Sequence, residues 1–477
     1  MNKEFLTILF GRLLIAVIGL ISLRVVTHYL EPSQYGELAL LMSIQAFSSL
    51  ILVNPVGQFI NVNTHKWHDE QTLMGRMGSY QGYLMIVGII GSIVVLFSMF
   101  NTSANLFLSM IVVGLSIFAI NWNSTVIPLL NMLGYQQTSI FWGVMTVVLG
   151  IIFSTLFVVF ISPSAINWLI GQGLGMFLGA LGAKFYLHKF TKSTKSYSKI
   201  SWINKRNLYA FCAPLVVATF LMWLSQSGYR FLVEHYWGLE KLAFLAVGLT
   251  VAGAIWAVVE AIVSQFLYPY FYRGAGGDDK GKVQTTYSDL VNVIIPVYIL
   301  IAGAMYLSAP YVLKVLVDEQ YQSALFFLTA GVFIEVLRLS TGVLSLAGHV
   351  THNTHQLTLP YAVGAILISC FIIIFGVYNI DLNAVAYLLI VAGVVTLVLM
   401  VYRMNFILAI QMNWKVWLIA LLASVLMIIQ SASTNGNVNW MQTFTYLLLI
   451  GVVTSMLIFL ILRKNPSFLR LTSISIK

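Results

Sequence analysis

"ALFFLTAGVFIEVLRLSTGVLSLAG", residues 324–348, is a run of apolar and small residues in which only Glu335 and Arg338 carry charge. A run of about 20 apolar residues crosses ~30 Å of hydrocarbon as an α-helix. The stretch therefore predicts a membrane-spanning helix. An ionised side chain at a helix centre costs about 2.5–3.5 kcal/mol on insertion scales. Two such residues near the middle of the span therefore indicate a specific role.

The composition extends this interpretation to the whole chain. Hydrophobic residues make up 59% of the 477 residues, charged residues only 8%, and the mean hydropathy is +0.90. A soluble protein carries about 25% charged residues. The apolar residues come in continuous blocks and not in the alternation of barrel strands. We therefore expect an all-α polytopic membrane protein with about fourteen spans. They lie near 5–30, 36–60, 80–100, 105–130, 139–161, 165–187, 208–234, 242–266, 288–308, 324–347, 357–379, 384–402, 414–430 and 441–462.

The distribution of basic residues predicts the orientation, because Lys and Arg in short loops stay on the cytoplasmic side. With the N-terminus inside, nearly all of them fall on the inner face, and only Lys241 and Lys314 fall outside. We expect a multi-pass protein of the bacterial inner membrane with both termini in the cytoplasm. The formal charge of +10 then suits anionic lipid and is no sign of nucleic-acid binding. Cys212 and Cys370 lie in apolar segments, and we expect no disulfide, metal or cofactor.

A basic segment divides the chain into two unequal parts. Residues 188–207, "HKFTKSTKSYSKISWINKRN", form the longest polar interruption and separate six spans from eight. A faint repeat, "HYLEPSQYGELA" at 28–39 and "HYWGLEKLAFLA" at 235–246, follows the first span of each part. Transporters are commonly built from such repeats. We expect an N-terminal lobe (1–187), a cytoplasmic linker (188–207), a C-terminal lobe (208–404), and a C-terminal helix pair with a cytoplasmic tail (405–477).

Polar faces within two spans mark candidate functional residues. Glu335 and Arg338 can pair along one helix, but such pairs contribute only ~0.2–0.5 kcal/mol in isolated helices. With Gly342, Ser345 and His349 they form one face, which either lines a hydrated cavity or locks helix packing. In the eighth span, Glu260 has no basic neighbour within one turn. It is either a proton or sodium coupling site or a permanently protonated residue bonded to a neighbouring helix.

Three arginines lie in the first spans of the two halves. Arg12 and Arg24 belong to the first span and Arg230 to the seventh. The guanidinium of Arg24 either reaches the membrane–water interface or faces a cavity. Arg230 either pairs with Glu234 or faces the same cavity. With Arg338 they form a cationic set, which suggests an anionic ligand.

Other features of the spans have plain packing explanations. Gly171, Gly175 and Gly179 recur at a spacing of four inside one span, which predicts close helix packing. Aromatic residues such as Trp122, Trp223 and Trp256 could stack on sugar rings, although packing explains each of them as well.

Several stretches carry a family resemblance. "THYLEPSQYGELALL" (27–41), "FLYPYFYR" (266–273) and "SAPYVLKVLVDEQYQSA" (308–324) resemble stretches of the polysaccharide flippases of the multidrug/oligosaccharidyl-lipid/polysaccharide (MOP) exporter superfamily. The resemblance covers essentially the whole chain. It departs from the family pattern where "HYLE" replaces an arginine-bearing "RYLG", and no arginine lies in the second span.

The resemblance implies a Wzx-type flippase with two six-helix lobes around a cationic central cavity and an extra C-terminal helix pair. Such a protein moves a polyprenyl-diphosphate-linked oligosaccharide, an O-antigen or capsule unit, to the periplasmic leaflet by alternating access. Arg12, Arg24, Arg230 and Arg338 would bind the diphosphate or sugar, and Glu260 and Glu335 would couple transport to H⁺ or Na⁺. A polysaccharide polymerase and assembly proteins would be its partners. The alternative is a cation-coupled drug or small-molecule exporter of the same superfamily. A membrane enzyme is less well supported, because no large extramembrane loop is present.

Overall fold

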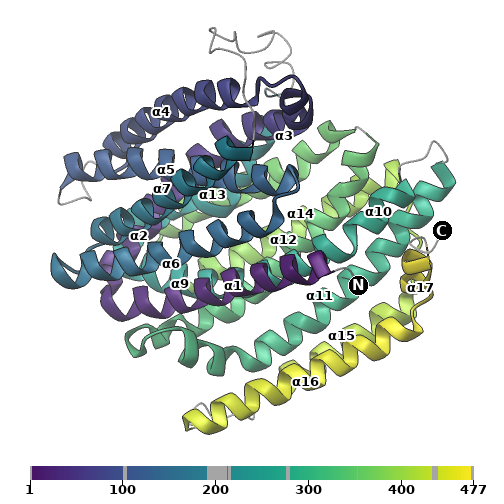
Figure 1. Cartoon of the computed structure of the whole chain (residues 1–477). Helices are drawn as coiled ribbons and strands as arrows, with labels where there is room; N and C mark the ends of the chain where they lie inside the picture. Colours follow the sequence, from purple (N-terminus) through teal and green to yellow (C-terminus); the bar gives the residue numbers. More distant parts are fainter. Residues whose placement is uncertain are drawn as a thin grey trace. The chain divides into compact units, whose positions relative to one another are not determined.

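The computed structural model describes residues 3–99, 105–190, 212, 216–275, 280–351, 353–431 and 439–473. These residues form helices joined by short turns, with no β-strand among them (Figure 1). The chain divides into two compact units, Met1–Ala243 and Phe244–Lys477. The expected lobe boundary at 188–207 lies almost wholly outside the described residues and stays a prediction.

Thirteen segments are long and apolar enough to cross a membrane in the described part of the chain. One of them, Val216–Arg273, is 58 residues long and contains a backbone kink at Gly238, where φ is 83° and ψ is 170°. It corresponds to two of the expected spans, 208–234 and 242–266. Counting its two arms separately gives fourteen spans, so the predicted all-α polytopic architecture is confirmed.

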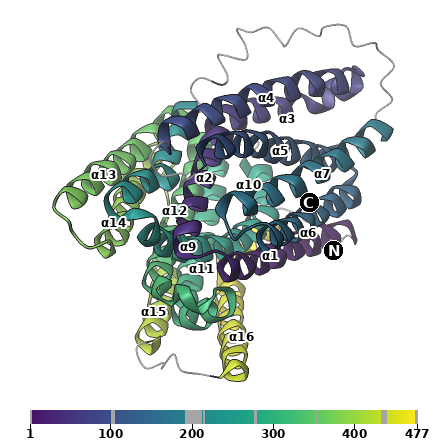
Figure 2. The ribbon, with the colours of Figure 1, turned by 90° about the vertical axis from the view of Figure 1, so that its left-hand side faces the viewer.

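The first unit begins at the N-terminus and ends within a long helix that continues into the second unit (Figures 1 and 2). Its elements are α1 (Lys3–Tyr29), α2 (Pro32–Phe47), the π-helix η1 (Ser48–Val53), α3 (Asn54–Asp69), α4 (Leu73–Ser98), α5 (Leu106–Met132), α6 (Gln136–Phe160), α7 (Ala165–Phe190), the π-helix η2 (Leu224–Gly228) and the first part of α9 (Tyr229–Phe266).

Local sequence explains where several helices begin and end. Pro32 stands in the first turn of α2, where its missing N–H costs no helical hydrogen bond. After α5, Gly134 adopts a positive φ of 91°, and the N–H of Tyr135 bonds to the carbonyl of Leu130 at 2.9 Å. A left-handed glycine after the last turn is a common helix stop.

Glycines bring α6 and α7 into direct backbone contact, as the sequence predicted. A Cβ atom added to Gly171 would lie 2.1 Å from the backbone N of Ser154, and one added to Gly175 would lie 2.3 Å from the N of Gly150. A Cβ at Gly179 would lie 1.8 Å from Thr146 Oγ1. In lipid, helices associate mainly through close packing, because hydrocarbon tails are as apolar as the helix surfaces. The glycine stripe therefore holds these two helices together.

The two repeat segments have the same local geometry. The rings of His28 and Tyr29 lie 5.0 Å apart at 74°, and those of His235 and Tyr236 lie 4.9 Å apart at 76°. Each pair stands where the first helix of its repeat ends, at Tyr29 in α1 and just before the kink at Gly238 in α9. The faint sequence repeat thus has a structural counterpart.

The second unit is organised around one long helix, α11. Its elements after α9 are α10 (Tyr268–Ala275), α11 (Lys280–Leu316), the 3₁₀ helices η3 (Glu319–Ala324) and η4 (Thr354–Leu357), α12 (Leu325–Val350), α13 (Thr358–Val377), α14 (Asn383–Ile407), α15 (Trp414–Ser431), α16 (Trp440–Lys464) and α17 (Pro466–Ser473). Helices α10, α12, α15, α16 and α17 all contact α11 (Figures 1 and 2). Trp256, Tyr287 and Tyr298 are fully buried in the core formed by α9, α10, α11, α12 and α14.

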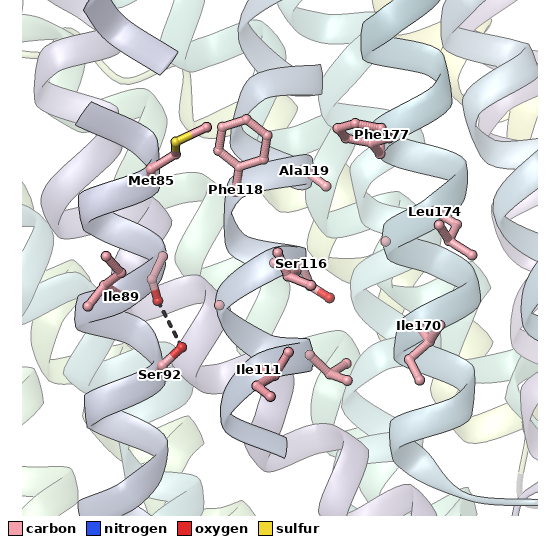
Figure 3. A pocket seen from close by; sticks show the side chains of 15 residues that line it. Met85, Ile89, Ser92, Ile111, Ser116, Phe118, Ala119, Ile170, Leu174 and Phe177 are labelled. Atoms are coloured by element: carbon pink, nitrogen blue, oxygen red, sulfur yellow. Dashed lines mark hydrogen bonds between the residues drawn. The ribbon is translucent and has the colours of Figure 1, made fainter. Parts of the chain in front are cut away.

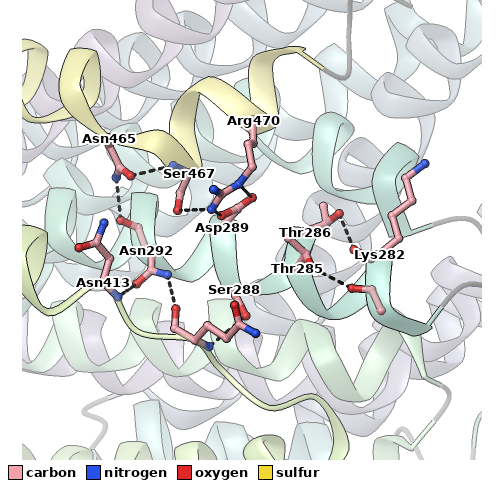
Figure 4. A network of polar contacts seen from close by, with 12 residues as sticks. Lys282, Thr285, Thr286, Ser288, Asp289, Asn292, Asn413, Asn465, Ser467 and Arg470 are labelled. Carbon is pink, nitrogen blue, oxygen red and sulfur yellow. Dashed lines mark hydrogen bonds and ion pairs between the residues drawn. The ribbon is translucent and has the colours of Figure 1, made fainter.

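A polar network fastens the C-terminal helices to α11 (Figure 4). Asn292 of α11 accepts hydrogen bonds from the backbone N of Asn413 at 2.9 Å and from Trp417 Nε1 at 3.0 Å. The backbone carbonyl of Asn292 accepts a hydrogen bond from Asn465 Nδ2 at 3.1 Å. These bonds satisfy a buried amide and fix the chain before α15 and before α17.

Candidate functional site

Glu335 and Arg338 form a close ion pair on one face of α12. Arg338 Nε donates a hydrogen bond to Glu335 Oε2 at 2.8 Å, and Nη2 lies 2.7 Å from the same oxygen. The two side chains are 18% and 36% exposed, so neither is sealed in the core. Residues three apart on a helix face the same way, and the pairing predicted along α12 is present.

A second carboxylate reaches the same arginine from α9. Glu260 Oε2 lies 3.7 Å from Arg338 Nη2, and the Glu260 side chain is 44% exposed. One guanidinium therefore stands between two carboxylates, held closely by Glu335 and loosely by Glu260. The sequence showed no basic neighbour for Glu260 within one turn. The structure supplies Arg338 from another helix, and no local pattern could have indicated that contact.

Small residues on α9 allow the two helices to approach. A Cβ added to Gly248 would lie 2.6 Å from the backbone N of Leu328 in α12. At Gly253, a Cβ would meet Glu335 Oε1 at 3.5 Å, an ordinary contact distance. The helices thus approach more closely at Gly248 than at Gly253, where the carboxylate of Glu335 lies beside the glycine.

Three tyrosines, none of them a candidate from the sequence, lie within electrostatic range of the charged cluster. Tyr268 interacts electrostatically with Glu260, Tyr298 with both Glu260 and Arg338, and Tyr361 with Arg338. They come from α10, α11 and α13, whereas the contacts of the cluster itself join α9 and α12. Tyrosines are frequent in this chain, and only their placement distinguishes these three.

The rest of the polar face on α12 is mixed. Gly342 borders open space, because a Cβ built there meets no described atom within 4 Å. Ser345 is buried and donates a hydrogen bond to the carbonyl of Gly342 at 2.7 Å, while His349 is exposed. That this face lines a hydrated cavity stays a prediction.

The other candidate cations lie in the first unit. Arg12 is exposed and Arg24 half-buried on α1, and twelve residues separate them, about 18 Å of helix rise. Arg230 lies at the start of α9, and its Nε is buried without a hydrogen-bond partner among the described residues. The structure thus groups Glu260, Glu335 and Arg338, and it keeps Arg12 and Arg24 apart.

The candidate sugar-stacking tryptophans have packing roles in this conformation. Trp122 and Trp256 are 3% and 0% exposed, which leaves no ring face open to a ligand. Trp223 is half-buried, and its Nε1 donates a hydrogen bond to the carbonyl of Ser43 at 3.0 Å.

Comparison with known proteins identifies the family. A family model described as polysaccharide biosynthesis protein matches residues 25–325. The lipid II flippase MurJ in an inward closed conformation aligns over 96% of this chain and 99% of its own, with a TM-score of 0.65 at 12% identity.

Two MATE transporters have a similar fold. An inward-facing multidrug resistance transporter of the MATE family aligns over 85% of this chain and 96% of its own, with a TM-score of 0.55 at 14% identity. For a eukaryotic MATE transporter the coverages are 90% and 98%, with a TM-score of 0.53 at 16% identity. No curated protein matches the sequence. The chain belongs to the polysaccharide biosynthesis protein family and has the fold of the MOP superfamily transporters.

Proposed function

We propose that this protein is a flippase that moves a polyprenyl-diphosphate-linked oligosaccharide, an O-antigen or capsule repeat unit, from the cytoplasmic to the periplasmic leaflet. The observation that carries the proposal is the cluster of Glu260, Glu335 and Arg338, placed within membrane spans of a polysaccharide-biosynthesis family member. Charged residues inside spans are costly and usually mark substrate or ion pathways.

Arg338 is the proposed phosphate ligand of the second unit. A guanidinium binds phosphate oxygens in pairs, which suits a diphosphate. In the present structure its Nε and Nη2 contact Glu335. Protonation of a carboxylate, or binding of Na⁺ to it, would release these donors for the substrate.

The two carboxylates have different proposed roles. Glu335 makes the short contacts and holds Arg338 in place, whereas Glu260 lies 3.7 Å away and is the more exposed of the two. Glu260 is therefore the better candidate for exchanging H⁺ or Na⁺ with water. Arg12, Arg24 and Arg230 are proposed as further contacts for the anionic head group.

The energetics of the proposed transport are favourable. The polyprenyl tail stays in lipid, so only the charged and hydroxylated head needs a hydrated path. Moving an anion out of an inside-negative cell is favoured by ~2.3 kcal/mol per charge per 100 mV. The proposed location is the bacterial inner membrane with both termini cytoplasmic, beside the polymerase and assembly proteins that would use the unit.

A cation-coupled exporter of drugs or small molecules is the second candidate. The observation that favours it is the balance of charge in the cluster, where two carboxylates face one arginine. Such a site suits a cationic ligand. Increased resistance to cationic dyes, with no restoration of surface polysaccharide, would support this alternative.

Complementation of a bacterial host that lacks its own flippase tests the proposal. Glu260→Gln, Arg338→Ala and Arg338→Lys are compared with wild type for surface polysaccharide, and membrane levels are checked by blot. Glu70→Gln is a matched control, because Glu70 is 42% exposed and lies 3.9 Å from Arg76. We expect the cluster variants to lose at least tenfold in activity while the control keeps it. Full activity in all the cluster variants would overturn the assigned roles.

A further inference from the structure

An apolar groove lies on the first unit between α4, α5 and α7. Its volume is about 630 Å³, and its walls include Met85, Ile89, Leu115, Phe118, Leu174 and Phe177 (Figure 3). This size is typical of a ligand site.

The polar atoms of the groove wall offer little to a hydrated ligand. Ser92 Oγ bonds to the carbonyl of Met110 at 2.7 Å and to that of Gly88 at 3.2 Å. Ser116 is almost fully buried. A sugar would leave its hydroxyl groups unsatisfied there, so the groove fits a hydrocarbon chain.

Aromatic rings connect one end of the groove to a lysine. The ring of Trp122 lies 5.5 Å from Phe118 and 5.6 Å from Phe177, both of which line the groove. Lys184 Nζ lies 5.6 Å from the centre of the Trp122 ring and donates a hydrogen bond to Gln81 Oε1 at 3.2 Å. Because Lys184 follows Phe177 by seven residues, it stands on the same face of α7, two turns beyond.

Lys184 has no acidic partner in the described part of the chain. Gln81 is neutral, and among the described residues the ammonium group otherwise contacts the face of Trp122. A half-buried cation with no carboxylate complements an anion such as a phosphate.

The length of this arrangement matches one leaflet of a bilayer. Lys184 and Ile170, at opposite ends of the site, are fourteen residues apart on α7, about 21 Å of helix rise. Half of a bilayer with its head groups is about 20–22 Å thick. A phosphate at Lys184 and a chain reaching Ile170 would thus span one leaflet.

We propose that this groove holds one anionic phospholipid of the cytoplasmic leaflet, with its phosphate at Lys184 and Gln81 and one acyl chain along α4, α5 and α7. The surface beside the groove is apolar, since Ile86 and Phe185 are 56% and 70% exposed, as expected where lipid covers a helix. The excess of basic residues at this end of α7 places it on the inner side, where anionic lipids are enriched.

Native mass spectrometry of the full chain released from nanodiscs tests the proposal. The discs contain phosphatidylglycerol, phosphatidylcholine with the same acyl chains, or phosphatidylcholine doped with a polyprenyl phosphate. We compare wild type with Lys184→Gln, with Lys184→Arg, and with Lys189→Gln. Lys189 is exposed on the same helix, so it controls for loss of one basic charge.

We expect wild type, Lys184→Arg and Lys189→Gln to retain one phosphatidylglycerol. Lys184→Gln should retain about fivefold less phosphatidylglycerol, which is the contribution of one basic residue near an anionic lipid surface. If wild type retained phosphatidylcholine as well as phosphatidylglycerol, the proposed recognition of an anionic head group would be wrong. If Lys189→Gln lost as much phosphatidylglycerol as Lys184→Gln, the loss would reflect the general surface charge and not a site at Lys184. Preferential retention of the polyprenyl phosphate would show that the groove binds an isoprenoid lipid and not the proposed phospholipid.

Discussion

Arg470 of α17 and Asp289 of α11, 181 residues apart, form a two-pronged ion pair (Figure 4). Arg470 Nε donates to Asp289 Oδ2 at 2.8 Å, and Nη2 contacts Oδ1. The Asp289 side chain is 5% exposed and the Arg470 side chain 55%. The pair therefore joins a water-accessible cation to a buried anion and holds the last described helix against the core of the second unit.

Breaking this pair should destabilise the protein. In Arg470→Gln the buried Asp289 loses its charged partner, which costs about 1–3 kcal/mol. Thermal unfolding in detergent should show a lower Tm than for Arg463→Gln, an exposed arginine in the preceding helix. The double variant Asp289→Asn/Arg470→Gln should recover part of the loss, because both charges are then removed. A Tm for Arg470→Gln equal to that of the control would mean that the pair contributes nothing.

The same pair should withstand alkaline solution. The hydrogen bond to Asp289 raises the pKa of Arg470 above its ordinary value. A group with a raised pKa stabilises the fold at every pH below its unfolded value, and this contribution is lost only as the pH rises through the folded value. We expect the Tm difference between wild type and Arg470→Gln to stay constant from pH 7 to about pH 10. If the Tm difference disappeared between pH 7 and about pH 10, the raised pKa assigned to Arg470 would be wrong.

Glu335 and Glu260 should differ in how much each contributes to the stability of the protein. Glu335→Gln loses short charge-assisted contacts, so we expect a cost of about 1.5–3 kcal/mol in unfolding free energy. Glu260→Gln loses a longer and more exposed contact, so its cost should stay below about 1 kcal/mol. Unfolding of both purified variants, beside polysaccharide export, measures this. Equal destabilisation would show that Glu260 is as structural as Glu335.

The contact between α6 and α7 should tolerate no side chain at Gly175. In Gly175→Ala the new methyl group meets the backbone of Gly150, and we expect a loss of about 1–3 kcal/mol. Gly19→Ala in α1 is the control, because a Cβ there meets open space, and alanine favours a helix by up to about 1 kcal/mol over glycine. Opposite shifts in Tm are expected. A neutral Gly175→Ala would mean that these helices can move apart freely.

The predicted orientation can be checked by single-cysteine labelling. With Cys212 and Cys370 replaced by serine, Lys241→Cys should react with an impermeant maleimide added to intact cells. Arg76→Cys should react only after the membrane is opened. The reverse pattern would invert the topology, and with it the leaflet assigned to Lys184.

The sequence predicted the helices well and the meetings between distant helices poorly. Span length, glycine spacing and the Glu335–Arg338 pair are each properties of a single helix, and they are present as expected. The approach of Glu260 to Arg338 depends on how α9 and α12 pack. The pattern of residues within a single helix does not predict how that helix packs against another.

The repeat segments also touch each other. A Cβ added to Gly36, just after the first segment's His–Tyr pair, would lie 2.1 Å from the carbonyl oxygen of Leu239, just after the second. Such a contact needs both segments at the same depth of the bilayer. Six crossings between them, an even number, return the chain to the face from which it left, whereas a repeat of five or seven would leave the segments ~30 Å apart on opposite faces. The even number of predicted spans in the repeat therefore lets its two His–Tyr segments meet at one face of the membrane.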